Sequence, residues 1–471
     1  MTTENKILLM NTKDVKKDIL WEKCSENDEA ILRLQTRFSE WLKMENICVL
    51  AGTGTSKKYG GFTLKELAKA LVLILKSYYK SKGENDYLTQ LSLISDSLEK
   101  NPENLEKWIS QLKGMSYLLE SDIFGESAIK IKDKEINLSI IQVIVKDIEK
   151  FIFLLSTLKL NSEEELEKAK GHHSFIAKLI SRDSSLGRVK LFTLNYDTLF
   201  EQALDDLGIL YADGFVGTVN RKFNPSCYEL DYYYPGKVSE GRVRRYDKFM
   251  HLYKLHGSIN WREPIKPGES VENVPVDLET INSLREKITN ITKGNYVFDE
   301  KTTKNIEKLL SGKKTLGILP TSNKYIETLQ MPYAYMFRAF QESLQNPQTF
   351  LLIIGYGFGD DHVNRIIEDA LANPSLIVCM VGPFALNGSN ELKNERIKKY
   401  LSLEMRGRIF LLTEQKPDES DPTTGFENLS TNLMPDVRML DQWIKLKQLE
   451  NKLKNKLSEE RLDKTGGNDE K

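Results

Sequence analysis

Glycine-rich and polar turns follow several short apolar runs in this sequence. Residues 47–51 (ICVLA) lead into GTGTS at residues 52–56, and a helical pattern with a capping-box match at residues 63–66 comes soon after. Glycine lets the backbone approach a ligand closely, and amide groups at the start of a helix can hold phosphate. The turn therefore suits the phosphates of a dinucleotide. Since Lys57 stands where a GxGxxG pattern needs glycine, an ordinary strand-to-helix turn is an equally good interpretation.

Two further turns carry side chains suited to positioning a ligand and transferring a proton. Asn195 and Asp197 follow the apolar run at residues 188–194, and His256 follows the run at residues 252–255. In α/β folds, ligands bind at the carboxyl ends of parallel strands. Imidazole is well suited to proton transfer near neutral pH. The alternatives are that Asn195 or Asp197 caps the following helix and that His256 is structural.

The cysteines and the remaining histidines give no metal-site pattern. Four cysteines stand far apart in the sequence, at Cys24, Cys48, Cys227 and Cys379. This spacing argues against a disulfide framework and excludes a CxxC…CxxC zinc site. The adjacent His172 and His173 have no third ligand spaced nearby. We expect no metal.

The order of apolar runs and helical patterns predicts the fold class. Short apolar runs that alternate with helices are typical of a doubly wound, parallel α/β sheet. A long helical block before residue 188 is expected to be an insertion into that sheet. The expected strands lie at residues 47–51, 188–194, 252–255, 350–354 and 376–381.

These patterns divide the chain into four parts. They are an N-terminal helical segment at residues 1–45, an α/β core at residues 46–64 and 186–385, a helical insertion at residues 65–185, and a C-terminal segment with a terminal helix at residues 386–471.

Charge and hydropathy limit the partners and the compartment. Lys plus Arg number 67 and Asp plus Glu number 68, so the formal net charge is −1. This balance argues against nucleic-acid binding by bulk positive charge. The N-terminus lacks the pattern of a signal peptide, and the longest apolar stretch, at residues 138–158, carries charges at its centre. We expect a cytoplasmic protein with no membrane span.

Four short motifs then support a family resemblance. GTGTS, TLNYD, LHGS and GYGFGD occur in this order over residues 52–360, each after an apolar run. The ordered set resembles the sirtuin-like superfamily. More narrowly, it is similar to the prokaryotic sirtuin-like NAD hydrolases of antiphage defence, as found in Thoeris, in defence-associated sirtuins and in systems paired with a HerA-type ATPase. The resemblance implies a Rossmann-like NAD-binding core with a helical module, and it does not cover the C-terminal segment.

The resemblance also implies roles for individual residues. His256 matches the catalytic histidine, and Asn195 matches the residue that orients the ribose or the attacking water. Asp197 matches the position that holds the carboxamide. The loops near the pyrophosphate and the adenosine supply the rest of the implied NAD-binding set, which is Gly52, Thr53, Gly54, Ser56, Asp197, Gly355, Tyr356 and Gly357.

Classical sirtuin deacylases carry a four-cysteine zinc module after the His-Gly turn. Residues 262–314 contain no cysteine, which disfavours a zinc-supported deacylase. The resemblance therefore favours a metal-independent NAD hydrolase that depletes NAD in abortive antiphage defence. The alternatives are an NAD- or ADP-ribose-binding subunit that regulates a partner ATPase or nuclease and, with less support, a deacylase. A homo-oligomer and a HerA-type ATPase partner are further expectations. The sequence leaves open the trigger and whether the product is linear or cyclic ADP-ribose.

Overall fold

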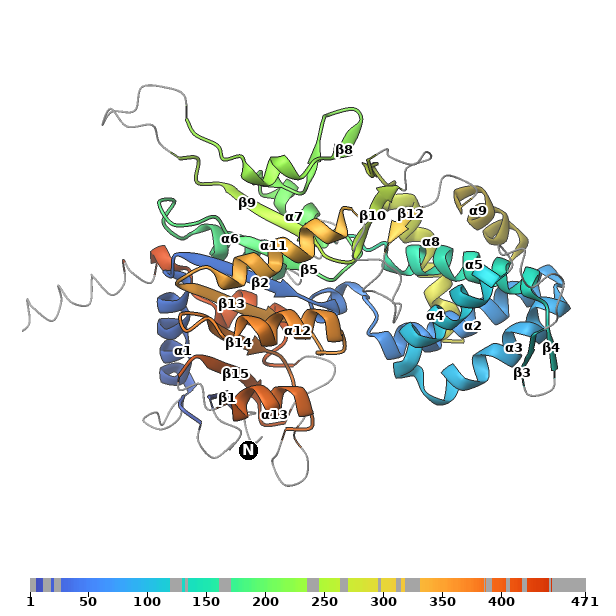
Figure 1. Ribbon diagram of the computed structural model, residues 1–471, viewed down its shortest axis with the longest axis horizontal. Helices are drawn as coiled ribbons and strands as arrows, with labels where there is room; N and C mark the ends of the chain where they lie inside the picture. The colour runs from blue at the N-terminus through green and yellow to red at the C-terminus, as the bar shows by residue number, and fades with distance from the viewer. Residues whose placement is uncertain are drawn as a thin grey trace, which may run out of the picture.

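The computed structural model is built around one large sheet (Figure 1). It describes residues 6–11, 18–20, 27–118, 129–131, 134–160, 171–234, 245–262, 270–294, 298–310, 315–317, 331–384, 386, 392–403, 407–416, 422–439 and 442. The sheet has eight strands in the order β1-β15-β14-β13-β2-β5-β9-β6.

The strands of this sheet are β1 (Ile7–Met10), β2 (Asn46–Ala51), β5 (Lys190–Thr193), β6 (Leu210–Ala212), β9 (Phe249–Lys254), β13 (Thr349–Ile354), β14 (Ile377–Val381) and β15 (Ile409–Glu414). Neighbouring strands are parallel, except that β1 runs antiparallel to β15 at the edge. The predicted fold class, a doubly wound and mostly parallel α/β sheet, is therefore confirmed.

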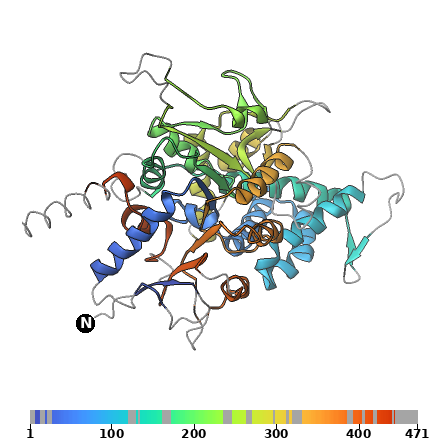
Figure 2. The same cartoon turned by 60° about the vertical axis from the view of Figure 1, so that its left-hand side comes forward.

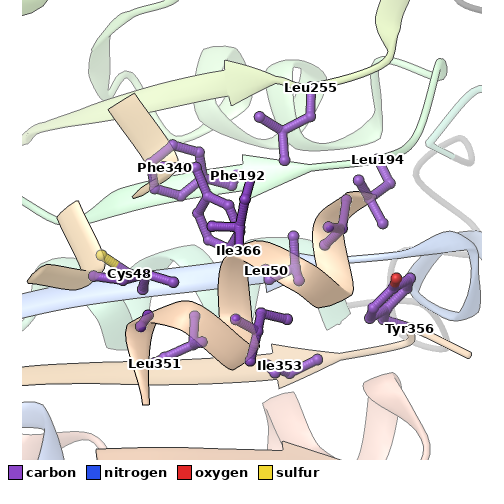
Figure 3. Close-up of a cluster of buried hydrophobic side chains, with 14 of the residues drawn as sticks. Cys48, Leu50, Phe192, Leu194, Leu255, Phe340, Leu351, Ile353, Tyr356 and Ile366 are labelled. Atoms are coloured by element: carbon purple, nitrogen blue, oxygen red, sulfur yellow. The ribbon is translucent and has the colours of Figure 1, made fainter. Parts of the chain in front are cut away.

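Helices cover both faces of the sheet, and the alternation of side chains along each strand explains why. In β13, Leu351 and Ile353 pack into one apolar layer, whereas Leu352 and Ile354 pack into the other. Figure 3 shows part of the first layer, in which Phe192 and Phe340 meet. Each fully buried Leu or Ile stabilises the fold by about 1.5–3 kcal/mol.

The first layer is covered by α11 (Tyr333–Gln345), α12 (Asp361–Ala370) and α13 (Glu395–Ser402). The second layer is covered by α1 (Asn27–Leu42), α6 (Gly171–Ile180), α7 (Leu199–Asp206), the short α14 (Phe426–Asn428) and the turn η4 (Leu429–Leu433). Figure 2 shows the blue α1 and the orange α11 on opposite sides of the sheet.

A separate helical unit extends from the sheet in Figure 1, and it has its own apolar core. Its elements are α2 (Leu64–Lys82), α3 (Asn85–Lys100), η2 (Pro102–Asn104), α4 (Leu105–Leu118), β3 (Ile129–Ile131), β4 (Lys134–Ile136), α5 (Leu138–Ser156), α8 (Leu278–Thr292) and α9 (Glu300–Leu310). The helices α8 and α9 come from the polar stretch after the His-Gly turn. In contrast, α6 packs on the sheet although it lies within residues 65–185.

A smaller sheet includes β10 (Gly257–Arg262), the strand that begins directly after His256. The order of this sheet is β12 (Thr315–Gly317), β10, β11 (Glu272–Asn273), β8 (Arg221–Phe223) and β7 (Phe215–Val216), and η3 (Pro225–Glu229) follows β8. The strands β1 and β15 add to the main sheet from segments in which the sequence patterns predicted no strand. The predicted terminal helix at residues 440–461 lies outside the described residues, apart from residue 442. Over the described residues, none of the helices has the length and apolar character needed to cross a membrane.

Candidate active site

The four motifs lie at one edge of the main sheet because the strands that precede them are neighbours. The order β13-β2-β5-β9 is parallel throughout, and its last paired residues are Ile354, Ala51, Thr193 and Lys254. The chain runs outward from β2 to β5 and later returns to β13 on the other side of β2. This reversal makes a topological switch point at β2 and β13, where open α/β sheets bind ligands.

The two glycine loops at the switch point pack backbone against backbone. The amide of Gly52 donates to the Ile354 carbonyl at 2.9 Å, and the amide of Gly54 donates to the Gly355 carbonyl at 2.9 Å. A Cβ atom on Gly355, which has φ +65°, would lie 2.6 Å from the Thr55 nitrogen. These three glycines therefore permit a close loop contact, and the amides of Gly52 and Gly54 already have backbone acceptors.

Other residues of these loops face solvent. Thr53 and Gly357 are exposed, and a Cβ atom on Gly357 would meet no atom within 4 Å. Both lie in the predicted NAD-binding set. The surface open to a ligand at the switch point thus includes Thr53 and Gly357.

Asn195 is the centre of a buried hydrogen-bond network. Its Nδ2 group donates to the hydroxyl oxygens of Thr55, at 3.0 Å, and Ser56, at 2.9 Å. These hydroxyls donate in turn to the Gly52 carbonyl at 2.9 Å and to Asp197 Oδ2 at 2.7 Å. Because each hydroxyl hydrogen has an acceptor of its own, the network fixes the orientation of the Asn195 amide.

This orientation leaves one buried acceptor without a partner. Asn195 is only 3% exposed, and its Oδ1 atom accepts no hydrogen bond from any described residue. A buried acceptor of this kind costs about 1–3 kcal/mol. Such a cost is typical of a group that a ligand satisfies. It also shows that Asn195 does not cap the following helix with this oxygen.

The helix cap belongs instead to Asp197. Its Oδ1 atom accepts from the Leu199 amide at 3.1 Å, while its Oδ2 atom accepts from Ser56. Burial raises the pKa of the Asp197 carboxyl, and the positive charge of Lys254 opposes that shift. Of the two interpretations of this turn, the cap therefore applies to Asp197, whose two oxygens both have protein donors.

Lys254, the last residue of β9, contacts the Asn-Tyr-Asp turn. Its side chain is buried, donates to the carbonyl of Asp197, and lies 2.9 Å from Glu201 Oε1. Burial raises the pKa of the Glu201 carboxyl, which Lys254 again opposes. A buried ion pair contributes little net stability. The contact of Lys254 with the Asp197 carbonyl links this ion pair to the turn.

His256 pairs with a carboxylate that the sequence patterns did not single out. Its Nε2 atom lies 3.0 Å from Asp360 Oδ2, and both residues are 7% exposed. A carboxylate only accepts hydrogen bonds, so Nε2 carries the hydrogen and Nδ1 is the basic nitrogen of the neutral ring. A histidine oriented by a carboxylate is a common arrangement for general acid–base catalysis.

Asp360 is itself held by the GYGFGD turn and by the start of α12. Its Oδ1 atom accepts from the amides of His362 at 3.0 Å and Val363 at 3.4 Å. The buried Tyr356 hydroxyl hydrogen-bonds to the Asp360 backbone and to Asn364 Oδ1 at 3.0 Å. Tyr356, which the resemblance places in the NAD-binding set, thus has its hydroxyl engaged inside the protein.

The structure brings the predicted residues to one edge of the sheet. The rings of Tyr196 and His256 have centroids 6.4 Å apart, which places the Asn-Tyr-Asp turn beside the His-Gly turn. Sequence reasoning missed Asp360 and Lys254. Signals were present for both, because Asp360 ends the GYGFGD motif and Lys254 is a charged residue in a strand whose residues are all buried.

A comparison with known families finds a match over part of the chain. Residues 189–402 match the family model described as a SIR2-like domain. The matched range runs from just before β5 to the end of α13, so it includes Asn195, Asp197, His256 and Asp360 but not the first glycine loop. A search of curated proteins returned no significant match. The similarity of residues 189–402 to a SIR2-like domain supports an NAD-related activity in general.

Potential metal ligands do not gather at this site. Among the residues that the structure describes, no group of three or more His, Cys, Asp or Glu side chains is arranged to hold a metal ion. Cys48, Cys227 and Cys379 are buried and unpaired. Burial raises the pKa of the Cys48 thiol to about 12 and that of Cys227 to about 11, so neither is a nucleophile near neutral pH.

Proposed function

We propose that this protein is an NAD glycohydrolase, which cleaves the bond between nicotinamide and ribose to give nicotinamide and ADP-ribose. The observation that carries the proposal is the buried, unpartnered Oδ1 atom of Asn195 at the switch point of a SIR2-like domain. A ribose hydroxyl or a water molecule is a donor of the kind that this atom lacks. The His256–Asp360 pair beside the same turn supplies the acid–base group.

For this reaction the protein needs mainly to position the substrate and to transfer a proton. The nicotinamide of NAD is already a cationic leaving group, and its bond to ribose breaks through an oxocarbenium-like transition state, as in glycoside hydrolysis. Asn195 Oδ1 orients the ribose or the water. His256 Nδ1 accepts a proton from that water or from a ribose hydroxyl, while Asp360 holds the ring. Asp197 holds the turn and, through it, the substrate carboxamide.

We further propose that the hydrolysis depletes NAD during abortive antiphage defence, as the resemblance to defence-associated sirtuin-like proteins suggests. An NADase that was always active would harm its own cell. The proposed role therefore requires regulation, either by assembly of several copies of this chain or by a partner such as a HerA-type ATPase. None of the proposed catalytic residues lies in the helical unit, which is therefore a candidate for such regulation.

Incubation of the purified chain with NAD tests the proposal. We expect equimolar nicotinamide and ADP-ribose, formed equally well with EDTA present, and little product from the His256→Ala and Asn195→Ala variants. If the chain binds NAD without turnover, alone and with partner proteins, the alternative of a binding subunit is correct. Product that depends on an acylated peptide would indicate a deacylase.

A further inference from the structure

A cavity of about 560 Å³ lies between the end of the first glycine loop and helix α8. One wall is formed by Lys57, Gly60 and Gly61, and the other by residues of α8 that include Arg285. The cavity adjoins the candidate active site, because a Cβ atom on Gly61 would lie 2.8 Å from the Cβ atom of Ser56. One loop therefore contacts Asn195 and Asp197 on one side and borders this cavity on the other.

Arg285 is a buried cation that makes no hydrogen-bonded ion pair with a described carboxylate. Its Nε group donates to the Leu155 carbonyl at 3.1 Å, and its Nη2 group donates to the Gly60 carbonyl. The side chain is 5% exposed, and no described carboxylate forms an ion pair with it. Burial lowers the pKa of the Arg285 guanidinium, and the charges of Glu286 and Asp197 oppose that shift without cancelling it. An anion in direct contact with the guanidinium would therefore stabilise it.

Arg285 lines the cavity, and its hydrogen bonds to the protein use only Nε and Nη2. Its Nη1 group makes no hydrogen bond to a described residue, and the guanidinium lies 5.9 Å from the centre of the Phe62 ring. Gly60, with φ +82°, is held close to it, since a Cβ atom there would lie 2.8 Å from Nη2. The guanidinium therefore fits against the loop only because residue 60 is glycine.

The other charges of the cavity leave a positive balance. Lys57, Arg285 and Lys293 are three cations, and Glu66 and Glu286 are two anions, so the difference is 3 − 2 = +1. Glu66 is already paired with Lys57 and caps α2, and Glu286 accepts from Asn282 at 3.1 Å. Glu286 keeps its charge, so the net balance of +1 favours an anion, with Arg285 at the wall and the exposed Lys293 at the end of α8.

We propose that this cavity binds the phosphate groups of a nucleotide, with Arg285 as the buried anchor and Lys293 as a rim contact. A guanidinium matches the geometry of phosphate oxygens with two parallel donors. That the ligand is a nucleotide rests on the proposed function. That the site binds phosphate rests on the cavity and on Arg285 alone. Two sources are consistent with this chemistry, namely the diphosphate of the substrate itself and a separate nucleotide that reports to the active site through the glycine loop.

Calorimetric titration with inorganic pyrophosphate and with ADP tests the site without any need for turnover. We expect both compounds to bind the wild-type chain. Their binding to Arg285→Gln should be weaker by about tenfold or more, because charge-assisted hydrogen bonds are lost. Lys293→Glu should weaken binding in a salt-dependent manner. Lys287→Glu is the matched control, because Lys287 is exposed on the same helix but does not line the cavity, and it should bind normally.

Two results would overturn the proposal. One is the absence of pyrophosphate and ADP binding to the wild-type chain at millimolar concentrations. The other is equal binding by the wild type, Arg285→Gln and Lys293→Glu. If Arg285→Gln does not fold, the comparison of Lys293→Glu with Lys287→Glu decides, because both positions lie outside the core.

Kinetics then separates the two sources of phosphate. If the cavity holds the substrate's diphosphate, Arg285→Gln raises KM for NAD but not for nicotinamide riboside, which has no phosphate, and ADP competes with NAD. If it holds a separate nucleotide, ADP changes kcat without competing. A chain that binds pyrophosphate through Arg285 but never hydrolyses NAD would refute the proposed function and leave the phosphate site intact.

Discussion

His256 Nε2 and Asp360 Oδ2 lie 3.0 Å apart, although 104 residues separate the two in the sequence. The pair joins the turn after β9 to the start of α12, across strands β2 and β5. Its carboxylate is fixed by two helix amides, and its imidazole lies beside the Asn-Tyr-Asp turn. Asp360 therefore acts on the proposed reaction through His256, as a positioning residue.

Asp360→Asn should separate this role from the role of Asp360 as a helix cap. Asparagine caps a helix about as well as aspartate, so the melting temperature should change little. If the amide oxygen keeps the contacts of Oδ1 with the helix amides, the NH2 group takes the place of Oδ2 and donates to His256 Nε2 instead of accepting from it. The wrong histidine tautomer should then lower kcat about 10²-fold or more. Steady-state kinetics and thermal melting on the same variant measure both effects.

Asp361→Asn is the matched control for that experiment. Its side chain is 88% exposed and pairs with Arg396 at the surface, so the same chemical change one residue away should leave turnover unchanged. A folded Asp360→Asn protein with normal turnover would show that the carboxylate does not orient the catalytic histidine.

Asn195→Asp should destabilise the fold, which differs from the behaviour of a simple helix cap. The hydroxyls of Thr55 and Ser56 both need a donor at this position, and aspartate presents an acceptor instead. We expect a loss of about 1–3 kcal/mol in the free energy of unfolding, measured by chemical denaturation. Thr55→Ser keeps the hydroxyl and is the control. An Asn195→Asp protein as stable as the wild type would contradict the network.

The glycines at the switch point should fall into two groups. Gly355→Ala should cost more than about 1 kcal/mol, because its φ of +65° is unfavourable for alanine and the new Cβ would lie 2.6 Å from the Thr55 nitrogen. Gly357→Ala and Gly359→Ala should leave the melting temperature nearly unchanged, since a Cβ atom would meet no atom within 4 Å at either position.

The same variants test where the substrate lies. If Gly357 borders the bound NAD, Gly357→Ala should raise KM for NAD while the protein stays fully folded. Gly359→Ala, which is outside the predicted NAD-binding set, is the control. Equal KM values for the two variants and the wild type would remove Gly357 from the binding set.

Two buried histidines should make the protein sensitive to mild acid. Burial lowers the pKa of His172 to about 3 and that of His251, with help from the charge of Lys190, to about 4. The unfolded chain, with histidine near 6.5, then binds more protons than the folded chain over the range from about pH 6.5 down to these values. The contribution of these two histidines to the free energy of unfolding is therefore fully present above pH 6.5 and falls as the pH decreases below that value. At pH 5, each group should cost about 2 kcal/mol.

Replacement of His172 by phenylalanine isolates this effect. The ring already contacts Tyr59, Phe200 and Phe426, so an aromatic side chain fits its surroundings. Between pH 7.5 and 5, His172→Phe should lose less stability than the wild type in chemical denaturation. Buried carboxyls with raised pKa values change the stability in the opposite direction, but they are the same in both proteins. Their contribution therefore cancels in the difference between the two pH profiles. Parallel pH profiles for the two proteins would contradict the assignment.

The strands next to the site were predictable because they are short apolar runs buried on both faces. This holds for β2, β5, β13 and β14. The helix α8 carries Ile281, Leu284 and Ile288 at helical spacing, but its many polar residues hide the pattern. The edge strand β1 has only four residues, and it pairs with β15, which lies far away in the sequence, so no local pattern reveals it.

The candidate site was predictable as a set of turns but not as a network. The motif order places Asn195 and His256 after neighbouring strands. Which of Asn195 and Asp197 caps the helix depends on hydroxyl groups about 140 residues earlier in the chain. The partner of His256 likewise depends on how β9 and β13 are arranged in the sheet. Contacts of this kind are tertiary, so residue spacing alone does not specify them.

Quantification of nicotinamide and ADP-ribose after incubation of the purified wild-type chain with NAD tests the central claim most directly. The account predicts equimolar release of both products, and a loss of about 10²–10⁴-fold in turnover for a folded His256→Ala protein. Absence of NAD cleavage by the folded wild-type chain, alone and together with its partners, would contradict the account. Cleavage that persists unchanged in His256→Ala would contradict the assigned site.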